Sequence, residues 1–154
     1  MFFPDMALAV KGMIRVLKPG GRLAAAVWLG PQKNVWVKTV LDAAAKHVEL
    51  PVPAPGGPSM FRCAAPGMFA ELFRQNGLME ISEIEMDGAL ECDAVETYWN
   101  LTSQCVGPFV SALAKTDEEG RKKIHQEVVE VIDRTYPDGN IALPSSTLIL
   151  YGKK

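Results

Sequence analysis

Alternating helical and strand patterns in this sequence predict an α/β fold. The first observation is a helical stripe of apolar residues that ends near residue 17 and is followed by a Pro-Gly-Gly turn. The second is an unbroken apolar run over residues 23–28, which is typical of a strand in a buried sheet. The third is the repetition of helix and strand patterns along the chain to an apolar run at residues 147–151.

The first helix has signals at both of its ends. Asp5 has the side chain of an N-cap, and apolar residues then recur at three- and four-residue spacing. Pro19 cannot continue a helix, and Gly20 accepts the left-handed conformation that closes one. We therefore expect this helix to end near Leu17.

The apolar run at residues 23–28 shows no alternation between apolar and polar positions. A strand covered on both faces requires this pattern, and its consecutive alanines would let flanking helices approach closely. The run therefore predicts a parallel strand in the centre of a sheet.

Further elements follow in order. The spacing predicts a helix over residues 37–48, a surface loop over residues 51–58 and a helix that begins at Ala65-Pro66. Residues 78–86 mix apolar and charged positions, which predicts a strand nearer the edge of the sheet.

The last third of the chain is mostly helical in pattern. Asp93 is the predicted cap of one helix, and Gly107-Pro108 precedes another. Thr116 with Glu119 three residues later matches a capping box for a long amphipathic helix. Residues 147–151 form the last predicted strand.

Composition excludes several classes of protein. The net charge of −2 creates no field that would attract nucleic acid or an anionic membrane surface. The three cysteines, Cys63, Cys92 and Cys105, form no C-x-x-C pair, so we expect reduced thiols and no metal site. No apolar stretch is long enough to span a membrane, and no signal peptide is recognisable. We expect a cytoplasmic protein.

The segment MFFPDMALAVKGMIRVLKPGGRLAAAVW, with its L-K-P-G-G turn, resembles class I S-adenosylmethionine-dependent methyltransferases of the type 11 kind, which act on small molecules. The resemblance implies that the three predicted strands correspond to the last three of that Rossmann-like sheet, in mixed parallel and antiparallel order. The last strand would insert antiparallel between the other two. It also implies one truncated domain over residues 1–154, a helical insertion over residues 93–143, and an N-terminal, cofactor-binding half that this chain lacks.

The cofactor motif of that family is absent from the sequence. The family binds S-adenosylmethionine through a Gly-rich turn after its first strand, where only Gly permits the backbone to approach the ligand. No two of the 13 glycines are separated by a single residue, so no G-x-G occurs. We therefore predict no cofactor-binding and no catalytic residue in this chain, and we expect S-adenosylmethionine only through the resemblance.

Candidate binding residues are aromatic. Five side chains are candidates for an apolar substrate pocket, although such aromatics are more often part of a core: Phe3, Trp28, Phe61, Tyr98 and Trp99.

Polar candidates have structural explanations that we prefer. His47 lies near a predicted helix end, where imidazole is favourable to the helix dipole, and His125 is expected to be solvated. The glutamates at residues 118–119 and 127–130 are expected on a solvated helix face. Arg62 beside Cys63 is a weaker candidate for an activated thiol.

Three functions remain open at this point. The first is the substrate-side half of a small-molecule methyltransferase, inactive alone and completed by an N-terminal half supplied elsewhere. The second is a non-catalytic module that forms a homodimer or larger homo-oligomer through the unpaired edge of its sheet. The third is a protein that binds an apolar ligand near Trp99 without a cofactor.

Overall fold

The computed structural model describes all residues from 1 to 154. It contains six α-helices, one short 3-10 helix and three strands, which confirms the α/β class. The chain divides into two compact units, each built from separate stretches of sequence. Unit 1 comprises Met1–Lys33, Pro53–Asp87 and Ser146–Lys154, and unit 2 comprises Asn34–Val52 and Gly88–Ser145.

The sheet has three strands in the order β1-β3-β2. They are β1 (Arg22–Trp28), β2 (Met79–Cys92) and β3 (Ile141–Lys153), and both β2 and β3 contribute residues to each unit. β1 pairs antiparallel with β3, from Arg22 opposite Lys153 to Trp28 opposite Thr147. The last strand therefore lies between the other two and antiparallel to β1, as expected, while both β2 and β3 are longer than the sequence pattern predicted.

The prediction that residues 23–28 form a parallel, central strand is wrong. β1 is an edge strand of this sheet, its neighbour is antiparallel, and only one of its faces is covered. Val27 is buried, whereas Ala24 and Ala26 on the opposite face are exposed. Alanine carries little apolar surface, so its exposure costs little, and an all-apolar run therefore does not require two covered faces.

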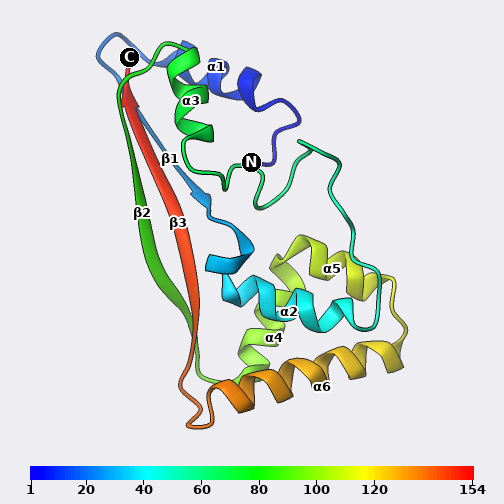
Figure 1. Cartoon of the computed structure of the whole chain (residues 1–154). Helices are drawn as coiled ribbons and strands as arrows, with labels where there is room; N and C mark the ends of the chain where they lie inside the picture. The colour runs from blue at the N-terminus through cyan, green and yellow to red at the C-terminus, as the bar shows by residue number, and fades with distance from the viewer. The chain divides into compact units, whose positions relative to one another are not determined.

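Helix α1 (Met6–Val16) and helix α3 (Met68–Gln75) lie on the same side of the sheet in unit 1 (Figure 1). The Asp5 carboxylate accepts a hydrogen bond from the Leu8 amide at 2.9 Å, and Leu17 is the C-cap, so both predicted ends are confirmed. Between these helices and the sheet lies one apolar core: Met6, Val10, Ile14, Val27, Leu29, Cys63, Phe69, Ala70, Phe73, Leu78, Leu148 and Leu150.

Lys154, which directly follows β3, connects the end of the chain to α1 in unit 1. The Lys154 ammonium donates to the carbonyls of Ile14 and Leu17 at 2.8 and 2.7 Å, at the C-terminal end of α1. The Gly20 amide donates to the Lys154 carbonyl at 2.7 Å, and Gly20 has the left-handed φ of 75° that the turn requires. A cation at a helix C-terminus also interacts favourably with the helix dipole.

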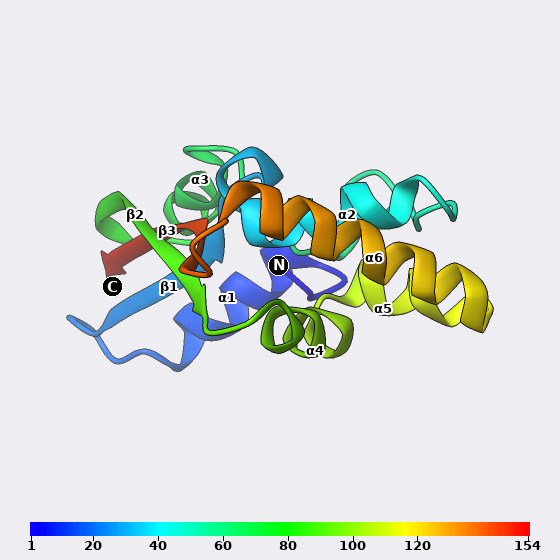
Figure 2. The same ribbon diagram turned by 90° about the horizontal axis from the view of Figure 1, so that it is seen from below.

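Unit 2 is built mainly from four helices: α2 (Val35–Ala45), α4 (Val95–Cys105), α5 (Gly107–Ala114) and α6 (Glu118–Thr135). The long helix α6 runs beside α2 (Figure 2) and also contacts α4. The largest fully buried side chains of this unit make its core: Val37, Val40, Tyr98, Val106, Phe109, Ile124, Val128, Ile132 and Leu143.

Two predicted helix starts are wrong by one residue. Ala94, rather than Asp93, is the N-cap of α4, and Asp93 instead accepts a hydrogen bond from the Thr97 hydroxyl at 2.6 Å. Asp117, rather than Thr116, caps α6 by accepting from the Gly120 amide at 2.8 Å. The Thr116 hydroxyl donates to the Ala112 carbonyl at the end of α5, so the residue belongs to the preceding helix.

The remaining predictions concern loops and the membrane. Residues 51–58 form a largely exposed connection without helix or strand, as expected. No helix has the length and apolar character needed to cross a bilayer.

Candidate functional site

The structure distributes the five aromatic candidates between the two units. Phe3, Trp28 and Phe61 belong to unit 1, and Tyr98 and Trp99 belong to unit 2. Phe3 is half exposed, Trp28 and Phe61 are partly buried, and Tyr98 is fully buried. The five side chains therefore differ in how accessible they are to a ligand.

Tyr98 is a core residue of unit 2. Its side chain is inaccessible, and its hydroxyl donates to the Trp36 carbonyl at 2.7 Å. Burial raises the pKa of the Tyr98 phenol, because the charged form would lose its hydration. Tyr98 thus stays neutral and serves packing, and it forms no pocket wall.

Trp99 is the candidate that lines a hollow in the surface. Its indole lies edge to face with Phe109, at 5.4 Å between ring centroids, and with His125, at 4.7 Å. A hollow of about 260 Å³ opens here. It is lined by Trp99, Arg121, Lys122 and His125.

From the sequence we expected His125 to be solvated, but in the structure it contacts two side chains of α4. Its Nε2 atom lies 2.9 Å from a carboxylate oxygen of Glu96, and its ring packs against Trp99. Glu96 and Trp99 lie one helical turn apart on α4, so both reach the same part of α6. Sequence reasoning missed this contact because α4 and α6 are separate helices, and no local pattern reports which of their faces meet.

A second hollow of about 630 Å³ lies beside the unit 2 portions of β2 and β3. It is open and lined by Glu91, Cys92, Asp93, Gly139, Asn140, Ile141 and Ala142. Burial raises the pKa of the Cys92 thiol, and the neighbouring Asp93 raises it further. A thiol with a raised pKa stays protonated, and it is the thiolate that attacks substrates or binds metals. Cys92 is therefore not an activated nucleophile.

Arg62 and Cys63 have structural roles. The Arg62 guanidinium donates to the carbonyls of Phe3 and Pro4, and so fixes the segment before α1. Cys63 is buried in the core of unit 1, whereas reactive cysteines lie in partly exposed, electropositive surroundings. The cysteines form no disulfide, and nothing at Cys63 resembles an activated thiol.

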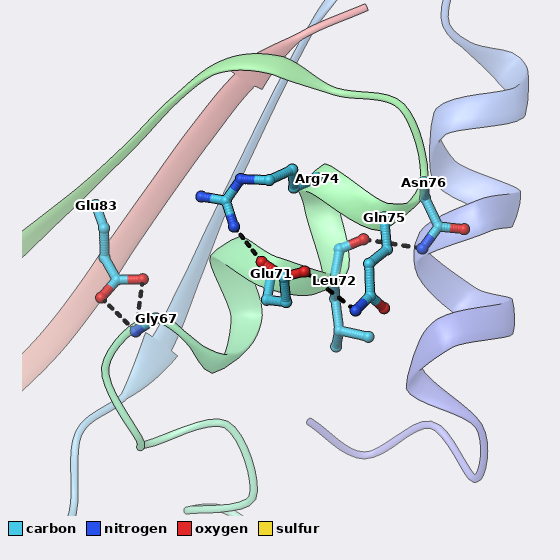
Figure 3. A network of polar contacts seen from close by, with 7 residues as sticks. All are labelled: Gly67, Glu71, Leu72, Arg74, Gln75, Asn76 and Glu83. Atoms are coloured by element: carbon cyan, nitrogen blue, oxygen red, sulfur yellow. Dashed lines mark hydrogen bonds and ion pairs between the residues drawn. The ribbon is translucent and has the colours of Figure 1, made fainter.

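The polar side chains around α3 also stabilise the fold (Figure 3). The Glu83 carboxylate on β2 accepts from the Gly67 amide at 2.9 and 3.2 Å, where α3 begins. At the other end, the Asn76 amide group donates to the Leu72 carbonyl at 2.8 Å. An anion at the helix N-terminus and a donor at its C-terminus satisfy groups that the helix leaves open.

Three of the four glutamates of α6 form ion pairs, as expected for a solvated face. Glu118 and Glu119 pair with Lys122 and Lys123 one turn later, at 2.8 and 2.7 Å. Glu127 pairs with Lys46 and lies 3.9 Å from the Nε2 atom of His47. No group of three His, Cys, Asp or Glu side chains is arranged to hold a metal ion.

Three carboxylates of unit 2 predict how its stability depends on pH. Hydrogen bonds lower the pKa of three carboxylates. The main donor is Thr97 for Asp93, Lys46 for Glu127 and Asn140 for Asp138. Their stabilisation is present above the unfolded carboxyl pKa of about 4 and is lost as pH falls through the lowered values. We expect thermal unfolding of unit 2, followed by circular dichroism, to shift to lower temperature below about pH 4. The Glu127→Gln variant should show a smaller shift, and an unchanged shift would contradict this.

No model of a known protein family matches the sequence. Among solved structures, the chain is similar to a presumed methyltransferase of Bacillus halodurans, with 15% identity and a TM-score of 0.47 over 99% of this chain and 64% of that one. It is also similar to phosphoethanolamine N-methyltransferase 2 of Haemonchus contortus in complex with S-adenosyl-L-methionine, with 13% identity and a TM-score of 0.39 over 99% of this chain and 30% of that one. The chain thus spans less than two thirds of the length of either protein.

Proposed function

We propose that this chain is the substrate-side part of an S-adenosylmethionine-dependent small-molecule methyltransferase and has no activity alone. The segment that carries the resemblance has the helix, turn and strand that it implies: α1, the Gly20 turn with its positive φ, and β1. The 154 residues offer no Gly-rich turn after a strand for the cofactor.

The observation that carries the proposal is the strand order. A last strand that inserts antiparallel between two earlier ones is what the resemblance implies for the end of this sheet, and β3 has this position. Helices α4, α5 and α6 all lie between β2 and β3 in sequence, where the resemblance places an insertion on the acceptor side. In such enzymes catalysis rests mainly on positioning the acceptor in line with the methyl group.

In this proposal the exposed aromatic side chains of this chain form the surface that faces the methyl acceptor. No residue of this chain acts as the catalytic base. Trp99 beside the Arg121–His125 hollow offers an apolar wall with cationic neighbours. Phe3, which is half exposed and whose carbonyl accepts a hydrogen bond from Arg62, offers a second apolar surface in unit 1. The binding site for S-adenosylmethionine, which is the methyl donor, and any catalytic base come from the complementing polypeptide.

Calorimetric titration of S-adenosylmethionine into the purified chain tests the first half of the proposal. We expect no saturable heat up to about 1 mM, a concentration at which even a binding free energy of about −4 kcal/mol is detectable. The DNA upstream of the coding sequence tests the second half. An upstream, in-frame sequence that encodes a strand followed by a G-x-G-x-x-G-like turn would support the enzyme. Tight binding of S-adenosylmethionine by the lone chain would contradict the first half of the proposal.

A non-catalytic, self-associating module is the second candidate, and the position of β1 favours it. β1 is an edge strand, and an unpaired strand edge can pair with that of another chain. Sedimentation velocity over a range of concentrations should then show a homodimer. A monomer at all concentrations would exclude this function.

An apolar-ligand protein is the third candidate, and the hollow at Trp99 favours it. A hydrophobic small molecule should quench Trp99 fluorescence saturably without any cofactor, and the Trp99→Phe variant should lose that part of the signal. Quenching that survives in Trp99→Phe would place the ligand elsewhere.

A further inference from the structure

The hollow beside Trp99 lies wholly within unit 2 and is lined by residues of two helices, α4 and α6. Its volume is about 260 Å³, whereas a cavity of about 150 Å³ encloses one benzene molecule. Drug-sized ligands occupy pockets of about 300–1,000 Å³. The hollow therefore fits a ligand with one small substituted ring.

Trp99 gives the hollow a fixed aromatic wall. Its indole lies edge to face with the ring of Phe109, at 5.4 Å between centroids, and with the ring of His125, at 4.7 Å. Phe109 is fully buried in the core of unit 2, so it anchors the indole. Edge-to-face contacts of this kind hold aromatic rings in a preferred orientation. A ring that enters the hollow meets an indole that is already in place, and little side-chain ordering opposes binding.

The α6 side of the hollow is cationic. Arg121 and Lys122 line it, and no carboxylate does. Two carboxylates lie close by and each has a partner, since Glu118 is 2.8 Å from the Lys122 ammonium and Glu96 is 2.9 Å from the Nε2 atom of His125. Arg121 is exposed and forms no ion pair. Its guanidinium is therefore open to an anion in the hollow.

The surroundings of the hollow favour a small molecule over a protein. The exposed residues beside it on α6 form ion pairs one helical turn apart, Glu118 with Lys122 and Glu119 with Lys123. The cores of protein interfaces are depleted of charged residues. A protein partner would have to bury or break these pairs, whereas a single ring inside the hollow leaves them in water.

We infer that this hollow binds a small aromatic carboxylate, with the ring against Trp99 and the carboxylate on the Arg121 guanidinium. The planar guanidinium fork matches a carboxylate and can donate two parallel hydrogen bonds to it. Ligand sites commonly combine an apolar wall with a few polar groups that fix the orientation of the ligand. The inference rests on the third candidate function, a ligand site at Trp99, and adds the charge of the ligand.

Titrations of phenylacetate and of its neutral amide, phenylacetamide, test the inference. The two probes have the same size and ring and differ in charge. Nuclear magnetic resonance shifts of the isotope-labelled full chain, including the Trp99 indole N–H, report the site and the dissociation constant of each. We expect phenylacetate to bind about fivefold more tightly at low salt, since an exposed ion pair contributes modestly. Added salt should reduce this preference, because it screens exposed charges.

Arg121→Gln should lower the preference for phenylacetate to less than about twofold and leave phenylacetamide binding unchanged. The matched control is Arg134→Gln, which removes the same charge at an exposed site about 20 Å further along α6 and should keep the full preference. Glu118→Gln frees Lys122 and should tighten phenylacetate binding about twofold, a gain that a misfolded variant cannot give.

The outcomes separate this inference from the candidate function below it. Equal binding of the two probes would overturn the inference and leave a site for neutral rings at Trp99. Absence of binding of both probes at about 10 mM would overturn it together with the third candidate function. A preference for phenylacetate that survives in Arg121→Gln would place the anion elsewhere and would overturn the inference as well.

Discussion

Replacing Tyr98 with Ala should lower the free energy of unfolding of unit 2 by about 3–5 kcal/mol, the range measured for buried aromatic side chains truncated to Ala. The side chain is fully buried, so its removal leaves a cavity among packed helices. The variant also loses the 2.7 Å hydrogen bond to the Trp36 carbonyl. A domain stability of about 5–15 kcal/mol leaves little reserve after such a loss. Urea unfolding followed by circular dichroism measures the difference.

Tyr98→Phe separates the ring from the hydroxyl. It keeps the packing and removes one hydrogen bond, so we expect a loss of about 0.5–1.5 kcal/mol. Tyr136→Phe is the matched control, since its hydroxyl donates at 2.9 Å to the Ala142 carbonyl in an exposed setting and its loss should change stability by less than about 0.5 kcal/mol. Equal losses in Tyr98→Phe and Tyr136→Phe, or a stable Tyr98→Ala, would contradict the assignment of Tyr98 to the core.

Phe73→Ala should have an effect of the same size on unit 1, about 3–5 kcal/mol. Phe73 is fully buried and packs at 5.0 Å from the ring of Phe69, on the face of α3 that covers the sheet. Its truncation should therefore loosen α3 from the strands. Hydrogen exchange should report this as faster exchange of α3 and β2 amides.

Met68→Ala is the control on the same helix. Met68 is 44% exposed, so its truncation should change stability by no more than about 0.5 kcal/mol. If Phe73→Ala were no more destabilising than Met68→Ala, the core of unit 1 would not rest on α3.

The sequence predicted best what neighbouring residues decide. Asp5 caps α1, Leu17 ends it and Gly20 turns the chain, because each of these depends on side chains a few residues away. Where two adjacent residues could serve, as with Thr116 and Asp117 at the start of α6, the local pattern could not choose. The side chain free of the preceding helix became the cap.

Long-range relations escaped the sequence. The apolar run of β1 said nothing about which strand would pair with it or whether both faces would be covered. Tyr98 and Trp99 are adjacent in α4, yet one is fully buried and the other lines a hollow, because successive helical residues point about 100° apart. The partner of His125 lies on another helix, and no spacing along one helix reports it.

The place of β3 in the sheet has a consequence for synthesis of the protein. Within unit 1, β1 and β2 flank β3 and do not pair with each other, and the β3 residues that join them come last in the chain. β1 and β2 can therefore join one sheet only after the β3 residues of unit 1 have been synthesised. Before that point the apolar side chains of Val27 and Ile81 lack the β3 residues they pack with, and exposed apolar surface of this kind is prone to aggregation.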